Sequence, residues 1–192
     1  MLLNMYLTMS PLIAGGVLNM LFTKTSLYKK YKYPIDGFKN YKDNKRIFGD
    51  NKTWIGFFSM ILFCIISQII CGFLCNNFNI NHLNDLYMVN HNTITFNILF
   101  GTLIGFVYML SELPNSFVKR RLNIKPGKTE SGTLGLVFFI IDQIDSLIGV
   151  MLILYLFSNI SIVKYFGYII VGALTHISIN LILYALKIRI NI

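Results

Sequence analysis

The stretch WIGFFSMILFCIISQIICGFL, residues 54–74, decides the fold class. It runs for 21 residues without a charged side chain. A helix rises about 1.5 Å per residue, so this length covers the hydrocarbon core of a bilayer, which is about 30 Å thick. A backbone in hydrocarbon must satisfy its own hydrogen bonds, and the stretch is therefore predicted to be a transmembrane helix.

The rest of the chain repeats this pattern. Hydrophobic residues make up 55% of the 192 residues and charged residues only 13%, whereas about a quarter of the residues in a typical soluble domain are charged. We predict an all-α integral membrane bundle of about five transmembrane helices, forming a single domain over residues 1–192. Pro114 is expected to end the third helix. The other four predicted spans are Tyr6–Phe22, Ile94–Leu110, Leu134–Phe157 and Tyr165–Leu186.

Basic residues predict the orientation of the bundle. Sixteen of the 17 lysines and arginines lie in Thr23–Thr53, in Ser111–Thr133 or after Leu186, and Lys164 is the exception. Loops rich in Lys and Arg stay in the cytoplasm. The chain is therefore expected to be a multi-pass protein of the cell membrane, with its N-terminus outside and its C-terminus cytoplasmic. Many of these lysines are explained by anionic lipid headgroups alone. Nucleic acid is not expected as a partner, because the basic loops flank spans and carry no known binding motif.

A short polar segment, Gly49-Asp50-Asn51-Lys52-Thr53, leads into the stretch that begins at Trp54. It resembles the end of a P-loop only superficially, because Asn51 and Arg46 stand where glycines are needed. Backbone amides at a helix N-terminus can still receive an anion. Asp50 fits equally well as a simple helix cap, so the segment indicates either a substrate loop or a cap.

Three successive cations, Lys119, Arg120 and Arg121, follow the third predicted span. Such a cluster commonly marks the membrane interface. Here it lies between Glu112 and an acidic span, which favours phosphate binding, and arginine binds phosphate through two parallel hydrogen bonds. Lys125 follows, just before a Pro-Gly turn.

Two carboxylates lie inside the fourth span. Asp142 and Asp145 are three residues apart, which puts both on one face of a helix. Carboxylates in hydrocarbon line a wet cavity, share a proton, hold a cation or bond to a neighbouring helix. Oxygen ligands of this kind fit Mg²⁺ shared with substrate phosphates. A weaker polar stripe, His176, Asn180 and Tyr184, runs down the last span, and hydrogen bonding between helices would explain it equally well.

Together these motifs resemble the CDP-archaeol synthase family, integral membrane cytidylyltransferases related to CDP-diacylglycerol synthase. The resemblance covers nearly the whole chain, in order. It is carried by Pro34-Ile-Asp36-Gly37, Gly49-Asp-Asn-Lys-Thr-Trp54-x-Gly56, Ser116-Phe-Val-Lys-Arg-Arg-x-x-Ile-x-Pro-Gly127, Asp142-Gln-x-Asp145 and His176-x-x-x-Asn180.

The resemblance implies that CTP and a phosphorylated lipid alcohol of the archaeol type give a CDP-lipid and pyrophosphate at a site facing the cytoplasm. It implies catalytic roles for Asp142, Asp145 and Lys52, with Mg²⁺ on the two aspartates. The implied nucleotide-binding residues are Asp50, Asn51, Lys52, Thr53, Lys119, Arg120 and Arg121, and the further candidates are Asp36, Glu112, Lys125, His176 and Asn180.

Two other functions are weighed against this one. The first keeps the reaction and replaces the lipid by phosphatidic acid, giving CDP-diacylglycerol. The second is a small transporter that uses the acidic pair for proton or cation coupling. A transporter predicts ionisable residues in both halves of the membrane and an inverted repeat, whereas the sequence gathers them in the half nearer the basic loops, apart from His176.

Overall fold

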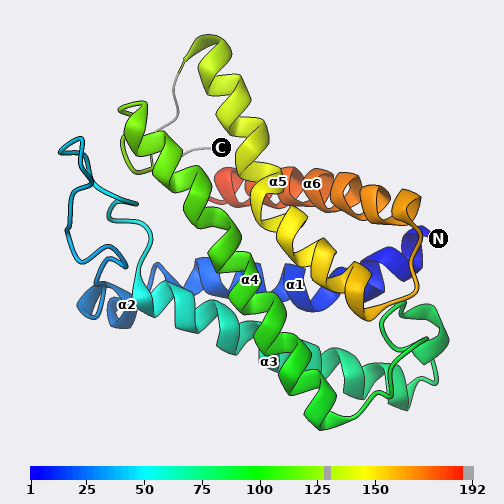
Figure 1. Ribbon diagram of the computed structural model, residues 1–192. Helices are drawn as coiled ribbons and strands as arrows, with labels where there is room; N and C mark the ends of the chain where they lie inside the picture. The colour runs from blue at the N-terminus through cyan, green and yellow to red at the C-terminus, as the bar shows by residue number, and fades with distance from the viewer. Residues whose placement is uncertain (128–130, 188–192) are drawn as a thin grey trace.

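The computed structural model describes residues 1–127 and 131–187, and this part of the chain is built of helices (Figure 1). Two basic residues counted above, Lys128 and Arg189, lie outside the described residues. The predicted all-α membrane bundle is confirmed, because five helices are long and apolar enough to cross a membrane. These are α1 (Leu2–Phe22), α3 (Trp54–Asn77), α4 (Ile94–Arg121), α5 (Gly132–Phe157) and α6 (Ile162–Ala185). Two short helices, α2 (Ser26–Lys30) and the 3₁₀ helix η1 (Asn81–Leu83), lie in the connections.

Successive long helices alternate in direction, so the connections separate into two groups (Figure 1). The α1–α3 and α4–α5 connections and the end of α6 lie at one end of the bundle, which we call the basic end. The N-terminus, the η1 connection and the α5–α6 turn lie at the other, which we call the opposite end. The described basic residues except Lys164 therefore belong to one end.

One expectation about a helix end is wrong, and one of the two alternatives for Asp50 is excluded. Helix α4 does not end at Pro114 but continues to Arg121. A proline inside a helix has no N–H to donate, so the carbonyl four residues before it loses its helical hydrogen bond. A membrane helix tolerates this loss. The cap of α3 is Thr53, whose hydroxyl accepts the N–H of Gly56 at 3.1 Å, and not Asp50.

Small residues bring the central helices close together. A Cβ atom at Gly101 or Gly105 of α4 would lie 2.7 Å from the Cα of Ile65 or Ile61 in α3. Gly15 of α1 faces α3 in the same way. Helix α5 packs on α4, and α6 packs on α5. Membrane helices gain packing energy when their backbones approach closely. These contacts place α3 and α4 at the centre of the bundle, with α1 and α6 at the flanks.

A buried polar cluster, which we call the end clamp, joins α1, α6 and the η1 connection at the opposite end. Asp85 is only 3% exposed. Its carboxylate accepts Nζ of Lys164 at 2.6 Å and the hydroxyl of Tyr168 at 2.5 Å. Its backbone N–H donates to Oγ1 of Thr8 at 3.0 Å. Lys164, the exception in the charge pattern, thus neutralises a buried acid.

Candidate active site

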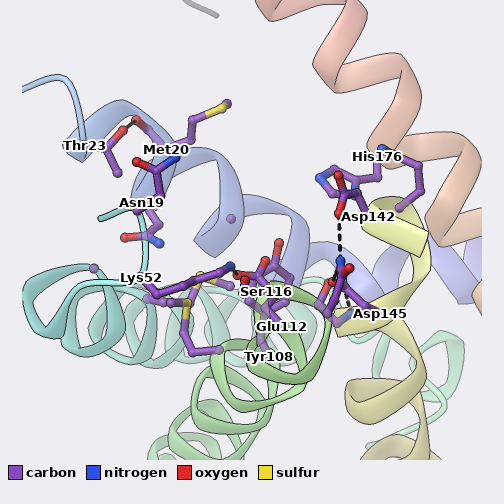
Figure 2. A pocket seen from close by; sticks show the side chains of 18 of the residues that line it. Asn19, Met20, Thr23, Lys52, Tyr108, Glu112, Ser116, Asp142, Asp145 and His176 are labelled. Atoms are coloured by element: carbon purple, nitrogen blue, oxygen red, sulfur yellow. Dashed lines mark hydrogen bonds and ion pairs between the residues drawn. The ribbon is translucent and has the colours of Figure 1, made fainter. Parts of the chain in front are cut away.

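A cavity of about 820 Å³ lies in the half of the bundle nearer the basic end, within the roughly 300–1,000 Å³ range of small-molecule sites. All five long helices and both basic-end connections contribute to its wall. Figure 2 shows Asn19 of α1 and Thr23, which follows the end of α1, facing Asp142 and His176 across it. Its ionisable and amide side chains include Lys24, Asn51, Lys52, Glu112, Asn115, Lys119, Arg120, Lys125, Asp142, Asp145, His176 and Asn180.

The two aspartates of α5 converge on one amide of α4. Nδ2 of Asn115 donates to Oδ1 of Asp142 and to Oδ2 of Asp145, both at 2.7 Å. Nζ of Lys119 lies on Asp142, 2.6 Å from its Oδ2. The i, i+3 spacing therefore does put both carboxylates on one face, and that face lines the cavity.

These residues fit a hard divalent cation. An ammonium group already rests on Asp142, and Oδ1 of Asn115 is buried with no hydrogen-bond partner. Among the described residues, no group of three or more His, Cys, Asp or Glu side chains could hold a metal. A cation here would therefore take its remaining ligands from phosphate and water, which is the usual arrangement for Mg²⁺.

A second ion pair crosses the cavity from α3 to α4. Nζ of Lys52, just before α3, contacts Oε2 of Glu112 (Figure 2). The two side chains are only 19% and 20% exposed, so the pair is largely withdrawn from water. Both residues were candidates from the sequence.

Among the residues that the structure describes, Arg120 has no such carboxylate partner. It is 9% exposed and lines the cavity, and within this part of the chain its Nε and Nη1 have no hydrogen-bond partner. A buried guanidinium without acceptors is unfavourable. The structure therefore offers a ready position for an anion with several oxygens beside Lys119 and Lys125.

Asp36 organises the loop that carries Lys52 and does not line the cavity. Its buried carboxylate accepts Nη2 of Arg46 at 2.7 Å and the backbone N–H groups of Phe48 and Gly49 at 3.0 and 2.9 Å. Burial alone would raise the pKa of Asp36, but these hydrogen bonds and the positive charge of Arg46 outweigh it and hold the pKa below its ordinary value. The loop is thereby fixed on the side where Asn51 and Lys52 reach the cavity.

Three other candidates are outside the cavity wall. Asp50 has a side chain that is 57% exposed and pairs with Arg46. Thr53 caps α3, and its hydroxyl lies 2.9 Å from that of Tyr28. Arg121 stacks on Phe117, with its guanidinium 4.4 Å from the ring centre, and donates to the backbone carbonyl of Lys45 at 3.1 Å. Arg121 therefore holds the α1–α3 connection against α4, whereas Asp50 and Thr53 bond within that connection and at the start of α3.

His176 and Asn180, the two candidates from the polar stripe of the last span, have different surroundings. His176 lines the cavity near Asp142 (Figure 2). Asn180 also lines it, and its Nδ2 donates to Oε1 of Gln143 at 3.2 Å, which is the hydrogen bonding between helices that the sequence left open.

Sequence reasoning missed several cavity residues. Asn115 follows Pro114, the expected end of the third helix, and so lay beyond the predicted span. Asn19 lies in the first span, where its Oδ1 accepts the hydroxyl of Ser59 at 2.6 Å. Lys24 belongs to the first basic loop, where anionic lipid headgroups explain many of the lysines. Extending α4 by its helical period would have found Asn115, three residues after Glu112 and four before Lys119.

Comparisons with known proteins agree on one family. A family model described as CDP-archaeol synthase matches residues 23–191. The CDP-archaeol synthase of Pyrococcus furiosus is 31% identical over 158 residues, covering 80% of each chain. That of Methanocaldococcus jannaschii is 29% identical over 158 residues, covering 81% of each. A solved structure described as an intramembrane enzyme for archaeal membrane lipid biosynthesis matches 92% of both chains with a TM-score of 0.63 and 18% identity, so the fold is shared.

Proposed function

Since this chain belongs to the CDP-archaeol synthase family, we propose that it transfers CMP from CTP to a phosphorylated lipid alcohol of the 2,3-dialkylglyceryl type, giving a CDP-lipid and pyrophosphate. One observation carries the proposal. A single intramembrane cavity combines a convergent carboxylate pair with Arg120, whose Nε and Nη1 are buried without a partner among the described residues. That combination suits a nucleoside triphosphate with its cation.

The lipid substrate would occupy the apolar side of the same cavity. Helices α1 and α6 contribute Ile13, Val17 and Ile179 to its wall. The two helices touch toward the opposite end, where Met5 faces Gly167 and the hydroxyls of Tyr6 and Thr175 are 3.3 Å apart. The alkyl chains would lie between these helices, with the phosphate head directed toward Asp142.

In the proposed reaction, an oxygen of the lipid phosphate attacks the α-phosphorus of CTP, and the bond to the leaving pyrophosphate breaks. The lipid phosphate is already ionised at neutral pH, so no separate general base is required. Arg120, Lys52 and Lys119 would bind the triphosphate oxygens and offset the charge that develops on pyrophosphate. In this proposal the cavity would hold both substrates in line, which would replace a chance encounter by a fixed geometry.

Asp142, Asp145 and Oδ1 of Asn115 would hold Mg²⁺ in this scheme. When bound there, the ion would neutralise part of the triphosphate charge and polarise the α-phosphorus. The carboxylates themselves would orient the nucleotide toward α5, and Asn115 would keep the two carboxylates converged.

The expected activity is tested directly with the purified chain in detergent. CTP and a 2,3-dialkylglyceryl phosphate should release pyrophosphate and form a CDP-lipid, and a chelator should abolish the reaction until Mg²⁺ is restored. Asp142→Asn should reduce turnover by about 100-fold or more, with the protein still folded. Faster turnover with phosphatidic acid would favour the CDP-diacylglycerol reaction. No pyrophosphate with either lipid would refute the proposal.

We also propose that the basic end faces the cytoplasm, where CTP is available, because lysines and arginines gather there. A cysteine introduced at Lys42, an exposed basic-end position, should resist an impermeant thiol reagent in intact cells. One introduced at His82, exposed at the opposite end, should react. The native cysteines Cys64, Cys71 and Cys75 are buried and provide the unlabelled background. The reverse labelling pattern would overturn the orientation.

A further inference from the structure

Both lysines that reach into the middle of the cavity rest on carboxylates. Lys52 contacts Glu112, and Lys119 contacts Asp142. Arg120 beside them has buried nitrogen atoms without partners. Lys52 and Lys119 must therefore leave a carboxylate before they can bind an anion, whereas Nε and Nη1 of Arg120 have no partner to leave among the described residues.

We propose that Glu112 is a positioning residue that holds Lys52 while the site is empty and gives it up to the triphosphate when nucleotide binds. The proposal rests on the proposed function, since it takes CTP as the ligand. It assigns Glu112 a role in nucleotide binding that is distinct from metal ligation by Asp142 and Asp145.

Because the Lys52–Glu112 pair is largely buried, the exchange of Lys52 from Glu112 to a phosphate depends on the binding of a cation. The side chains of Lys52 and Glu112 are both about four-fifths buried. Removing one partner of a buried ion pair leaves an uncompensated charge, which is strongly unfavourable. A phosphate that takes Lys52 therefore leaves Glu112 as a buried anion beside more negative charge. The exchange becomes favourable only when a cation compensates that charge.

The ion pair between Lys119 of α4 and Asp142 of α5 has the opposite requirement. A divalent cation drawn to Asp142 displaces Lys119, and the displaced ammonium then needs an anion. The triphosphate supplies an anion for both lysines, and the cation compensates the carboxylates. Each ligand thus provides the partner that the other removes, so the affinities must rise together and by the same factor.

The geometry allows the exchange without movement of the backbone. The carbonyl of Lys52 accepts the N–H of Ile35 at 2.8 Å, and its N–H donates to the carbonyl of Gly49. The side chain extends from this fixed point across the cavity to Glu112 (Figure 2). Its four rotatable bonds let the ammonium turn toward a phosphate while the loop stays in place.

The test is CTP binding by calorimetry, using the full chain in detergent with chelator and with Mg²⁺. Glu112→Gln frees Lys52, and it should tighten CTP binding in chelator by roughly tenfold, the order expected from removing a nearby charge in a partly buried site. The advantage that Mg²⁺ gives to CTP binding should shrink by the same factor. Asp43→Asn removes one negative charge at the basic end outside the cavity wall, and it should leave both affinities unchanged.

A double-mutant cycle separates the exchange from simple repulsion between Glu112 and phosphate. The gain from Glu112→Gln should be several-fold larger in the presence of Lys52 than in a Lys52→Gln background. Glu112→Asp keeps the charge and shortens the reach to Lys52, so it should give part of the gain.

Equal gains in the two backgrounds, or weaker binding by Glu112→Gln, would overturn the exchange. A wild-type chain that binds no CTP even with Mg²⁺ would instead overturn the proposed function.

Discussion

Arg120 and Arg121, adjacent at the end of α4, carry the same charge into different surroundings. Arg120 lines the cavity and has no carboxylate partner among the described residues. Arg121 is outside the cavity wall, pairs with Asp43 at 2.7 Å, lies over Phe117 and donates to a backbone carbonyl of the α1–α3 connection. We therefore propose nucleotide binding for Arg120 and a structural role for Arg121, although the family resemblance implied nucleotide binding for both.

Substitution of the two arginines should separate these roles. Arg120→Gln should lower kcat/KM for CTP by about 10- to 100-fold, the value of a charged hydrogen bond to phosphate, with little change in Tm. Arg121→Gln should lower Tm by several degrees and affect CTP use less. Lys29→Gln, on the exposed surface of α2, should change neither. Steady-state kinetics with varied CTP and thermal unfolding in detergent measure both quantities. A larger kinetic loss for Arg121→Gln at unchanged Tm would reverse the assignment.

At the scale of elements, the α1–α3 connection is ordered by one buried acid. Asp36 accepts a guanidinium and two backbone N–H groups within the segment that leads to Lys52. The loop therefore behaves as a folded unit around a carboxylate, and its stability should follow the ionisation of that carboxylate.

The pH dependence follows from the sign of the shift. The pKa of Asp36 is lowered in the folded protein from an unfolded value of about 3.9. Its contribution to stability is therefore complete above the unfolded pKa and is lost as pH falls through the folded pKa. Asp36→Asn should cost about 2 kcal/mol at pH 7, and the difference in unfolding free energy from wild type should shrink in acid. Thermal or denaturant unfolding from pH 7 to pH 3 measures this. A difference that is constant over the whole range would rule out the ionised carboxylate as the stabilising group.

The extent to which elements could be predicted depends on what surrounds them. The α3 stretch after Trp54 is predicted correctly, because a long run of apolar residues without a charge is typical of a transmembrane helix wherever it lies in the bundle. The final turns of α4 were missed, since they are polar, contain Pro114 and lie beyond the apolar window. The i, i+3 pair Asp142 and Asp145 could be predicted from spacing alone. The sequence does not predict which of the two neighbouring arginines, Arg120 or Arg121, faces the cavity, because that depends on the rotation of α4 against α3.

At the scale of the whole molecule, a buried polar cluster joins the helices at the opposite end of the bundle, and a cavity separates them in the half nearer the basic end. The end clamp ties α1, α6 and the η1 connection together through Asp85, Lys164 and Tyr168. The cavity lies in the half nearer the basic end, and the same two helices contribute to its wall. The clamp therefore fixes how far apart α1 and α6 stand where the lipid would lie.

Breaking the end clamp should loosen the bundle. Asp85→Asn leaves Lys164, whose side chain is 24% exposed, with a partly buried, unpaired charge and should cost about 2 kcal/mol of stability. Adding Lys164→Gln removes that charge and should recover part of the loss, because replacing both partners is milder than removing one. Unfolding in detergent gives the three values. If the double variant were less stable than Asp85→Asn by the full cost of a second independent substitution, the two side chains would not be coupled.

The cationic wall of the cavity also affects what happens after the chemical step. Lys52, Lys119 and Arg120 would attract a polyanion to the site, and the same field would retain the pyrophosphate that leaves. Turnover would then be limited by the departure of the inorganic product and not by bond breaking. Moderate salt would speed that departure while it slows the arrival of nucleotide, so the rate would pass through a maximum with ionic strength. In a cell, hydrolysis of pyrophosphate would set the pace of the reaction as well as its direction.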